Sequence, residues 1–214
     1  MRWLSRLFSF AFPRRCMFCR KVIDAEHLVC TECEESHPSV LLYKQLPKPM
    51  QKFFCVVPYV YRDEVRDAIL RFKFRNRREY AAWFAVRMAE AIAEAELSAC
   101  THVTAVPLSK SRLHERGYNQ AELLARELAS ILQLPYEESL LKVKENRLQH
   151  RLKADERKKN VHGVYSALQD VSAMGKCYLL VDDIITTGET LGECTRILMR
   201  AGADDVFCVC IAKR

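Results

Sequence analysis

Glycine and proline are scarce in this sequence, with only 6 and 7 residues among 214. Such low counts argue against a fibrous or disordered chain, and no internal repeat or low-complexity segment is present. Half of the residues are hydrophobic, which is enough for a sizeable core. The length then allows one ordinary α/β domain with a small appendage.

A long hydrophobic run is also missing. The apolar stretch at 1–12 is interrupted by Arg6 and followed by Pro13, Arg14 and Arg15, without a small-residue cleavage site before the cysteines. It is too short to span a bilayer, so we expect no transmembrane segment. We interpret it as an amphipathic lead-in that packs on the protein, with peripheral membrane contact as the alternative. A cytoplasmic protein is therefore expected.

Acidic residues are outnumbered, because 34 Lys and Arg face 27 Asp and Glu and leave a formal net charge of +7. A basic surface of this size suits an anionic partner such as phosphate, nucleic acid or an acidic protein. The net charge alone does not choose among these partners.

Cysteine, by contrast, is abundant, with 10 residues. Four of them form two Cys-x-x-Cys pairs separated by ten residues, at Cys16, Cys19, Cys30 and Cys33. Each pair can grip one metal ion from a tight turn, and four thiolates favour a closed structural zinc site. Disulfides are the alternative, but they are rare in a reducing cytoplasm. The others lie in apolar stretches and are expected in the core: Cys55, Cys100, Cys177, Cys194, Cys208 and Cys210.

Hydrophobic patterning after the cysteines predicts alternating strands and helices. The expected strands are 103–106, 140–143, 177–181 and 206–212, and the expected helices are 63–71, 80–97, 120–132 and 190–200. Apolar strands that alternate with helices argue for an α/β fold with a parallel sheet covered on both faces. The last 38 residues form one βαβ unit, and 103–143 can be read as another.

The remaining segments are predicted to be irregular. Residues 46–58 contain three prolines and read as a linker, and 109–119 read as a polar loop. We therefore divide the chain into a lead-in with a zinc-binding module at 1–45 and an α/β domain at 46–214.

The carboxyl end of the predicted strand 177–181 carries the strongest functional signal. The residues that follow it are Asp182, Asp183, Thr186, Thr187, Gly188, Glu189 and Thr190, which lead into a helix. A helix N-terminus offers free N–H groups and a positive dipole end to a phosphate, and Gly188 lets the backbone curl around it. The two carboxylates can accept hydrogen bonds from vicinal hydroxyls or help to place Mg²⁺. An ordinary N-capped turn would explain one Thr and one Asp, but not the whole set.

Residues 179–190 resemble the phosphoribosyl-diphosphate (PRPP) motif of type I phosphoribosyltransferases. The resemblance implies a parallel sheet of that kind. It also implies that Asp182 and Asp183 hold the ribose 2′- and 3′-hydroxyls, that residues 186–190 bind the 5′-phosphate, and that Mg²⁺ accompanies PRPP.

Nearly the whole chain is similar to the ComF/GntX-like family, which is associated with competence and the use of external DNA. The shared elements are the four-cysteine module, Lys73 between two phenylalanines, and the segments 106–109, 116–125, 149–165 and 179–190. The chain departs from the family pattern at Lys142 and Asn146, where an Arg and a Thr are common. A Lys at position 142 keeps the charge but loses the bidentate fork of an Arg.

Basic residues follow the predicted strand 103–106. The Pro107-Leu108-Ser109-Lys110 segment precedes Arg112 and Arg116, and the resemblance implies a pyrophosphate loop at this place. Lys and Arg stabilise charge that develops as pyrophosphate leaves. A solvated basic loop is the alternative. Lys73 and Arg116 join the two aspartates as candidate catalytic residues, with Ser109 and Lys110 as candidate ligand-binding residues.

Residues 142–159 contain eight Lys or Arg and resemble in position the mobile hood loop that closes over the site of type I enzymes. A solvated charge run is one alternative. Another is a groove for single-stranded nucleic acid, in which Phe72, Phe74 and Tyr80 stack on bases.

Two functions of different classes are consistent with the sequence. The first is a PRPP- and Mg²⁺-dependent phosphoribosyltransferase with an acceptor that the sequence does not name. The second is a non-enzymatic protein of natural transformation that retains the PRPP cradle. Such a protein would bind single-stranded DNA or a competence protein partner.

Overall fold

The computed structural model describes residues 13–37, 42–45, 54–144, 163–168 and 172–214. A six-stranded sheet has the order β1-β2-β8-β7-β4, with β3 paired to β8. Within it β1 runs antiparallel to β2, and the other pairs are parallel. The predicted α/β fold with a parallel sheet is therefore confirmed. The strands are β1 (Leu42–Gln45), β2 (Phe54–Val57), β3 (Tyr59–Val60), β4 (His102–Ala105), β7 (Cys177–Ile185) and β8 (Asp205–Lys213).

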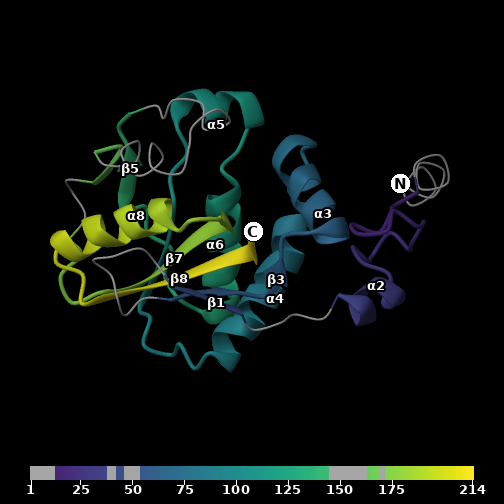
Figure 1. The fold of residues 1–214 in the computed structure, drawn as a ribbon, viewed down its shortest axis with the longest axis horizontal. Coiled ribbons are helices and arrows are strands. Elements are labelled where there is room, and N and C mark those ends of the chain that lie inside the picture. The colour runs from purple at the N-terminus through teal and green to yellow at the C-terminus, as the bar shows by residue number, and fades with distance from the viewer. Residues whose placement is uncertain (1–12, 38–41, 46–53, 145–162, 169–171) are drawn as a thin grey trace, which may run out of the picture.

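Helices surround this sheet. α4 and α6 pack against each other, α6 also contacts β4 and β7, and α8 contacts β7 and β8. Figure 1 shows β7 and β8 near the centre, with α8 along one side of them and α3 toward the N-terminal end of the chain. The helices are α2 (Thr31–Ser36), α3 (Asp63–Phe74), α4 (Tyr80–Glu94), α5 (Lys110–Arg116), α6 (Gln120–Leu132) and α8 (Glu189–Arg200).

The two central strands are continuous apolar runs because protein covers both of their faces. The residues of β7 from Tyr178 to Val181 are fully buried, and so are Cys208 and Cys210 on β8. All six cysteines outside the paired motif are buried, as the sequence predicts. The core is therefore centred on the strand that leads to the acidic pair.

Caps define the ends of α6 at the predicted residues. The Asn119 side chain accepts a hydrogen bond from the Ala121 N–H at 3.1 Å, which satisfies a free donor of the first turn. At the other end Gln133 adopts the left-handed conformation with φ 55°. The helix buries Leu124 and Leu128 and fixes the segment before it, which faces the candidate site.

The expectation of a polar loop at 109–119 is wrong, because the segment contains α5. Ser109 caps this helix by accepting a hydrogen bond from the Arg112 N–H at 3.4 Å, and Gly117 ends it with φ 76°. The helix has no buried residue, so hydrophobic periodicity could not reveal it.

The second predicted βαβ unit, at 103–143, is also wrong. β5 (Leu140–Lys142) pairs with β6 (Tyr165–Ala167) in a separate two-stranded antiparallel sheet, while the parallel neighbour of β4 is β7. The last βαβ unit, β7–α8–β8, is confirmed. Hydrophobic patterning detects a strand but does not choose its partner, which is why the sequence assigned β5 to the main sheet.

Some sequence predictions fall outside the described residues. These are the lead-in at 1–12, the linker part 46–53, Asn146, and most of the expected hood segment 142–159, from residue 145 onward. The rest of the predicted linker contains β2. Within the described residues, no helix is long and apolar enough to cross a membrane.

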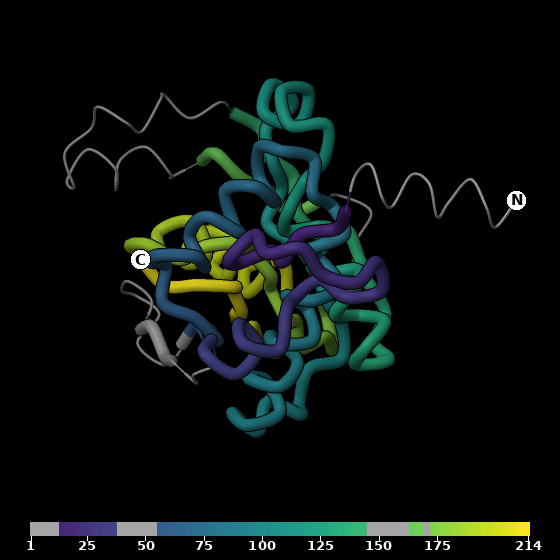
Figure 2. Tube along the Cα trace, turned by 90° about the vertical axis from the view of Figure 1, so that its right-hand side faces the viewer, coloured from purple at the N-terminus to yellow at the C-terminus, as the bar shows by residue number. Residues whose placement is uncertain are grey.

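The four-cysteine module, residues 13–37, packs on α3 and α4. Phe18 stacks on His37 with ring centroids 4.7 Å apart and meets the edge of Trp83 on α4 at 5.2 Å. Buried module residues belong to the same core cluster as the sheet. Figure 2 shows the module passing alongside the segments that follow it in the chain.

The proposed division at residue 45 remains a prediction. β1 lies on the module side of that division, yet it pairs with β2 in the main sheet.

Candidate functional site

The acidic pair lies inside β7, which continues to Ile185 instead of ending before the aspartates. The Asp182 position pairs with Cys210 of β8, so the neighbouring strand fixes its place in the sheet. The Asp183 N–H donates a hydrogen bond to Asp182 Oδ1 at 2.8 Å. Both side chains are partly buried. The two carboxylates thus sit at the carboxyl-terminal part of a central strand, where ligands bind in parallel sheets.

Lys73 from α3 supplies the counter-charge to this pair. Its Nζ lies 2.8 Å from Asp183 Oδ2, and both side chains are largely buried, with exposed fractions of 14% and 13%. The sequence separates these residues by more than a hundred positions, and only the packing of α3 near the sheet brings them together. A partly desolvated ion pair of this kind holds both groups in position.

The pKa of Asp182 differs from that of a carboxyl on the protein surface. Burial raises its pKa to about 7, and the negative charge of Asp183 acts in the same direction. The Asp183 N–H, Lys73 and Lys142 act against this rise. A carboxyl with its pKa near neutrality is sensitive to any ligand that donates a hydrogen bond or brings charge.

The phosphate loop follows at residues 186–190. Gly188 has φ 85° and precedes the first residue of α8, a left-handed conformation that favours glycine. The Glu189 N–H points to Thr187 Oγ1 at 3.5 Å. A small cavity of about 40 Å³ is lined by Asp182 and by residues 184–191. The helix N-terminus and this hollow form a cradle with the shape and polarity for a phosphate.

A larger cavity of about 560 Å³ opens beside the cradle. It reaches both aspartates, Thr186 and Thr190, so one ligand can span the acidic pair and the phosphate loop. The basic residues that line it are Lys73, Arg112, Arg116, Lys142 and Arg214. Cations outnumber carboxylates on its walls, which favours an anionic ligand.

Arg116 is held at the rim of this cavity. Its Nη1 donates to Gln120 Oε1 at 2.8 Å, and its guanidinium lies over the Phe74 ring, 5.0 Å from the centroid. Within the described residues its buried Nε has no hydrogen-bond partner. The next residues, Gly117 and Tyr118, are tied to α3 and its following turn: Arg78 donates to the Gly117 carbonyl at 3.2 Å.

The structure places most, but not all, of the predicted site residues on the walls of the two cavities. Those that line the larger or the smaller cavity are Lys73, Arg116, Asp182, Asp183, Thr186, Thr187, Gly188, Glu189 and Thr190. Ser109 and Lys110 do not line either one: Ser109 is buried as the cap of α5 and Lys110 is exposed. Their role in binding stays a prediction.

Other residues line the larger cavity without having been singled out for it. Tyr61, Asn119, Gln120 and Tyr165 belong to this group. Lys142, which departs from the family pattern, also lines it, and its Nζ lies 5.3 Å from the centroid of the Tyr165 ring. Asn119, Gln120, Tyr165 and Lys142 lie in segments that the family resemblance had marked, but no local pattern indicated that these side chains share one cavity.

The four-cysteine cluster has the geometry of a closed metal site. The four Sγ atoms all lie within 4.8 Å of one another, and those of Cys19 and Cys30 are 3.6 Å apart. Tetrahedral zinc with Zn–S bonds of about 2.3 Å requires sulfur separations of about 3.8 Å, so the donor set fits zinc. None of the ten cysteines, all of which are described, is in a disulfide.

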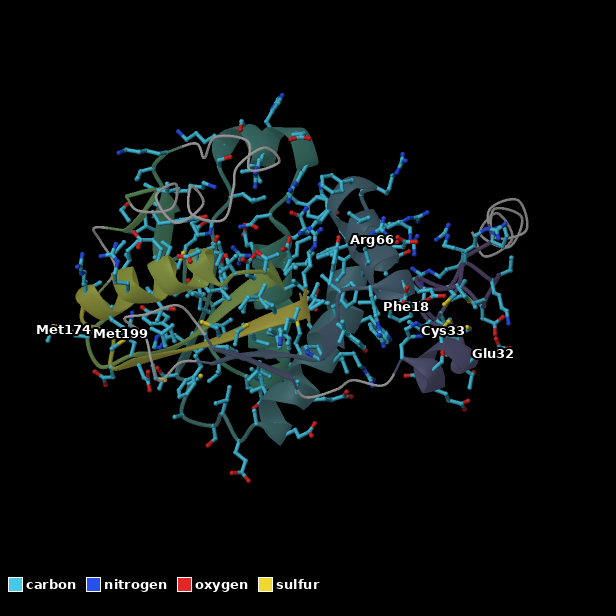
Figure 3. All side chains as sticks on the ribbon, viewed as in Figure 1. Phe18, Glu32, Cys33, Arg66, Met174 and Met199 are labelled. Carbon is cyan, nitrogen blue, oxygen red and sulfur yellow. The ribbon has the colours of Figure 1, made fainter. Side chains whose placement is uncertain are left out.

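Backbone N–H groups support the thiolate form of Cys16. Those of Phe18 and Cys30 point to its Sγ at 3.4 Å and 3.5 Å. Burial opposes ionisation of this thiol, but the N–H groups outweigh it and lower its pKa to about 7. Figure 3 shows Cys33 and Phe18 in the region where the module meets the rest of the molecule.

Two relatives of this chain match it over nearly its whole length. The chain is 28% identical to DNA utilization protein YhgH of Salmonella typhimurium, over 97% of this chain and 95% of the relative. It is 30% identical to competence protein F of Haemophilus influenzae, over 91% of this chain and 95% of the relative. No protein-family model matches the chain.

Similar solved structures share the fold at low identity. One is the allosteric regulatory enzyme of purine biosynthesis, with 22% identity and a TM-score of 0.43 over 66% of this chain and 30% of that chain. Another is a purine phosphoribosyltransferase from Pyrococcus horikoshii Ot3, with 18% identity and a TM-score of 0.38 over 61% and 74%. These values describe a likeness of fold and nothing of function.

The fold and the site define an α/β protein with a mostly parallel sheet and a four-cysteine module at its N-terminal side. Its candidate site joins the acidic end of β7 to the glycine-capped start of α8. The chain belongs to the competence protein F (ComF) family.

Proposed function

We propose that the chain binds PRPP or ribose 5-phosphate in the 560 Å³ cavity and acts as a phosphoribosyltransferase in DNA utilization. The observation that carries the proposal is that Asp182, Asp183 and the start of α8 line two hollows that share Asp182, Thr186 and Thr190. A phosphate at the N-terminus of α8 directs its sugar back toward the strand. The carboxylates are then within reach of the 2′- and 3′-hydroxyls.

The cations of the cavity have a role in the chemistry. Transfer from PRPP breaks the bond between ribose C1 and pyrophosphate, so negative charge develops on the leaving group. Lys73, Arg112 and Arg116 lie on the walls where they can stabilise that charge. No protein nucleophile is required, because positioning and charge stabilisation suffice.

Magnesium belongs to the proposal only as a companion of PRPP. It prefers carboxylate, water and phosphate oxygens, and it supplies positive charge beside a diphosphate when bound. Here Asp183 is paired with Lys73, and Asp182 accepts the Asp183 N–H. These contacts suit carboxylates that accept hydroxyl hydrogen bonds from a sugar, so we assign the aspartates to the ribose.

The test is calorimetric titration with ribose 5-phosphate and with PRPP, with and without Mg²⁺. A variant with Asp182→Asn and Asp183→Asn keeps the side-chain volumes and removes the charge. Charge-assisted hydrogen bonds contribute about 1.5–3 kcal/mol each, so we expect affinity to fall about tenfold or more per residue.

The matched control carries Asp204→Asn and Asp205→Asn, another adjacent acidic pair, where β8 begins and β7 starts beside it. We expect the control to bind as the parent does. Equal affinity of the double Asn variant at 182 and 183 would mean that these carboxylates are structural and the proposal is wrong.

A second candidate is binding of single-stranded DNA, and one observation favours it. A cavity of about 580 Å³ beside the module is lined by Arg14, Arg15, Arg20 and Arg77, with Glu79 as the acidic residue. Four arginines around one hollow suit a phosphate backbone. The relative named DNA utilization protein makes DNA the natural ligand to test, and a competence protein partner would be a further ligand of the same surface.

Binding of a labelled oligonucleotide over a range of salt concentrations tests this candidate. We expect weak binding that falls steeply with salt, and a flatter slope after Arg15→Met and Arg77→Met. The control is Arg62→Met with Arg66→Met, two exposed arginines near the start of α3. Binding that ignores salt, or the same loss in both variants, would exclude a specific role for the cavity.

A further inference from the structure

Three consecutive residues at the end of α3 contact three different parts of the molecule. Arg71 contacts the four-cysteine module, Phe72 contacts Tyr118 beside Arg116, and Lys73 contacts Asp183. We call residues 71–73 the α3 junction. It is the place where the metal-binding part of the chain and the candidate ligand site meet through a short stretch of one helix.

The first contact reaches the loop that holds the metal ligands. Arg71 Nη2 donates to the Met17 carbonyl at 2.7 Å and to the Phe18 carbonyl at 3.4 Å. Met17 and Phe18 are the two residues between Cys16 and Cys19, and both are buried. The carbonyls that receive Arg71 therefore belong to the same turn that presents two of the four thiolates.

The second contact reaches the rim of the cavity. The Tyr118 hydroxyl donates to the Phe72 carbonyl, and the two rings pack with centroids 6.0 Å apart. Phe72 is fully buried and Tyr118 nearly so, which leaves little freedom at this point. Because Arg116 lies two residues before Tyr118, movement of the junction would move the rim as well.

The third contact places the site cation. Lys73 Nζ reaches Asp183 from the helical turn that carries Arg71, so a shift or rotation of this turn would change the Nζ–Oδ2 distance directly. A rigid helix transmits displacement over two residues almost without loss. The Lys73 ammonium group is thus held by Asp183, while the helical turn that carries it is held on the module through Arg71.

We propose that metal binding by the four-cysteine module and ligand binding in the cavity are coupled through the α3 junction, with Arg71 as the positioning residue. Zinc fixes the turn of Met17 and Phe18, this turn holds Arg71, and Arg71 holds the last turn of α3 so that Lys73 and Arg116 face the ligand. The ligand side of this inference rests on the proposed function. By linkage, ligand binding also raises the affinity of the module for zinc.

The first experiment measures the affinity for ribose 5-phosphate by calorimetry, before and after zinc is removed with a chelator. We expect removal to weaken binding about tenfold in the parent, within the usual range of coupling between two sites. In an Arg71→Met variant, zinc removal should have little further effect, because the connection is already broken. Equal weakening in the parent and in the variant would overturn the proposal.

Matched variants separate positioning from general loss of stability. Arg71→Lys keeps one donor and should restore part of the affinity, while Arg71→Met should not. Arg66→Met makes the same change on the same helix, at an exposed residue whose near partner is Asp67 at 3.9 Å, and Figure 3 shows Arg66 on α3. This control should bind ligand and respond to zinc as the parent does; a loss as large as that of Arg71→Met would contradict the role of Arg71.

A measurement without ligand distinguishes failure of this inference from failure of the proposed function. Hydrogen exchange of the Arg75 amide, which bonds to the Arg71 carbonyl at 2.9 Å, reports on the last turn of α3. We expect exchange there to accelerate when zinc is removed and in Arg71→Met. If the parent fails to bind ribose 5-phosphate but shows this acceleration, the proposed function falls and the coupling of module to helix stands. If exchange does not change, the coupling is wrong whatever the ligand.

Discussion

The candidate cavity has two walls that are built in different ways. One wall is contiguous: Asp182 to Thr190 run along the end of β7 into α8. The other is assembled from Lys73 on α3, Arg112 and Arg116 on α5, and Lys142 on β5. The contiguous wall holds the carboxylates and the phosphate cradle, and the assembled wall holds the positive charge. If the proposed function holds, the residues that recognise the sugar phosphate are local in the sequence, whereas those that stabilise charge meet only through tertiary packing.

The four cysteines of the module, like the residues of the contiguous wall, lie close together in the sequence, within residues 16–33. The contacts that hold the module on the rest of the chain are, like the assembled wall, made by residues distant in sequence: Arg71 on α3 and Trp83 on α4. The following changes perturb one kind of construction at a time, and they are ordered by the size of the expected effect.

The largest effect is expected from Cys30→Ser with Cys33→Ser. Half of the thiolate ligands are lost, and the binding energy of structural zinc is folding energy for a small module. Metal analysis of the parent, purified under reducing conditions, should give about one equivalent of zinc, and the variant should give none. Cys100→Ser, a buried cysteine outside the cluster, should keep its zinc. A zinc-free parent would contradict the metal site.

The next effect is a pH dependence from Asp182 in the contiguous wall. The folded pKa of about 7 lies above the ordinary value of 3.8. The folded chain therefore binds more protons than the unfolded chain between these values, so stability falls as the pH rises from about 4 to about 7. The slope that one such group contributes is at most about 1.4 kcal/mol per pH unit.

Denaturant unfolding of the parent and of Asp182→Asn across this range checks the sign. The stability difference should shift in favour of the Asn variant as pH rises and become constant above about pH 8. Asp204→Asn serves as the control and should leave the pH profile of the parent unchanged. A stability difference that does not vary with pH would show that Asp182 ionises normally.

A smaller effect is expected from Lys73→Met in the assembled wall. The substitution removes the cation from Asp183, which lies next to a second carboxyl. We expect this to lower the free energy of unfolding by about 2 kcal/mol or more. Because Lys73 lowers the pKa of Asp182, its removal raises that pKa further, and the loss of stability should be larger at pH 8 than at pH 5. Thermal unfolding at the two pH values measures this. Arg126→Met, which removes an exposed ion pair with Glu122, should show no such difference.

The smallest effect is expected from Gly188→Ala, which changes the phosphate cradle without touching a charge. A Cβ at φ 85° costs about 1–2 kcal/mol of backbone strain, so the turn of the free variant should relax away from the cradle geometry, and restoring that geometry on binding should lower phosphate affinity about tenfold. Titration with inorganic phosphate and ribose 5-phosphate checks this. Gly192→Ala, inside α8, should bind as the parent does. If both variants bind normally, the cradle does not require the left-handed turn.

Several features followed from sequence patterns because they depend on near neighbours. The apolar run of β7, the start of α8 and the paired cysteines are local and match the expectation, although β7 continues through the acidic pair to Ile185. α6 matches its predicted bounds because Asn119 caps it and its apolar face repeats regularly. The capped helix α5 was not predicted because it buries no side chain. β5 was assigned to the wrong sheet because hydrophobic periodicity does not specify a partner strand.

The sequence on its own thus specified the contiguous wall and the four-cysteine cluster, whose chemistry depends on residue type and spacing over a few positions. Tertiary structure alone decided that Lys73 faces Asp183, that Arg116 lines the cavity while Lys110 does not, and that Arg71 holds the turn of Met17. The physical reason is that side chains far apart in the chain meet only after burial of the core has positioned α3 and α5 beside the sheet. No local propensity encodes that position.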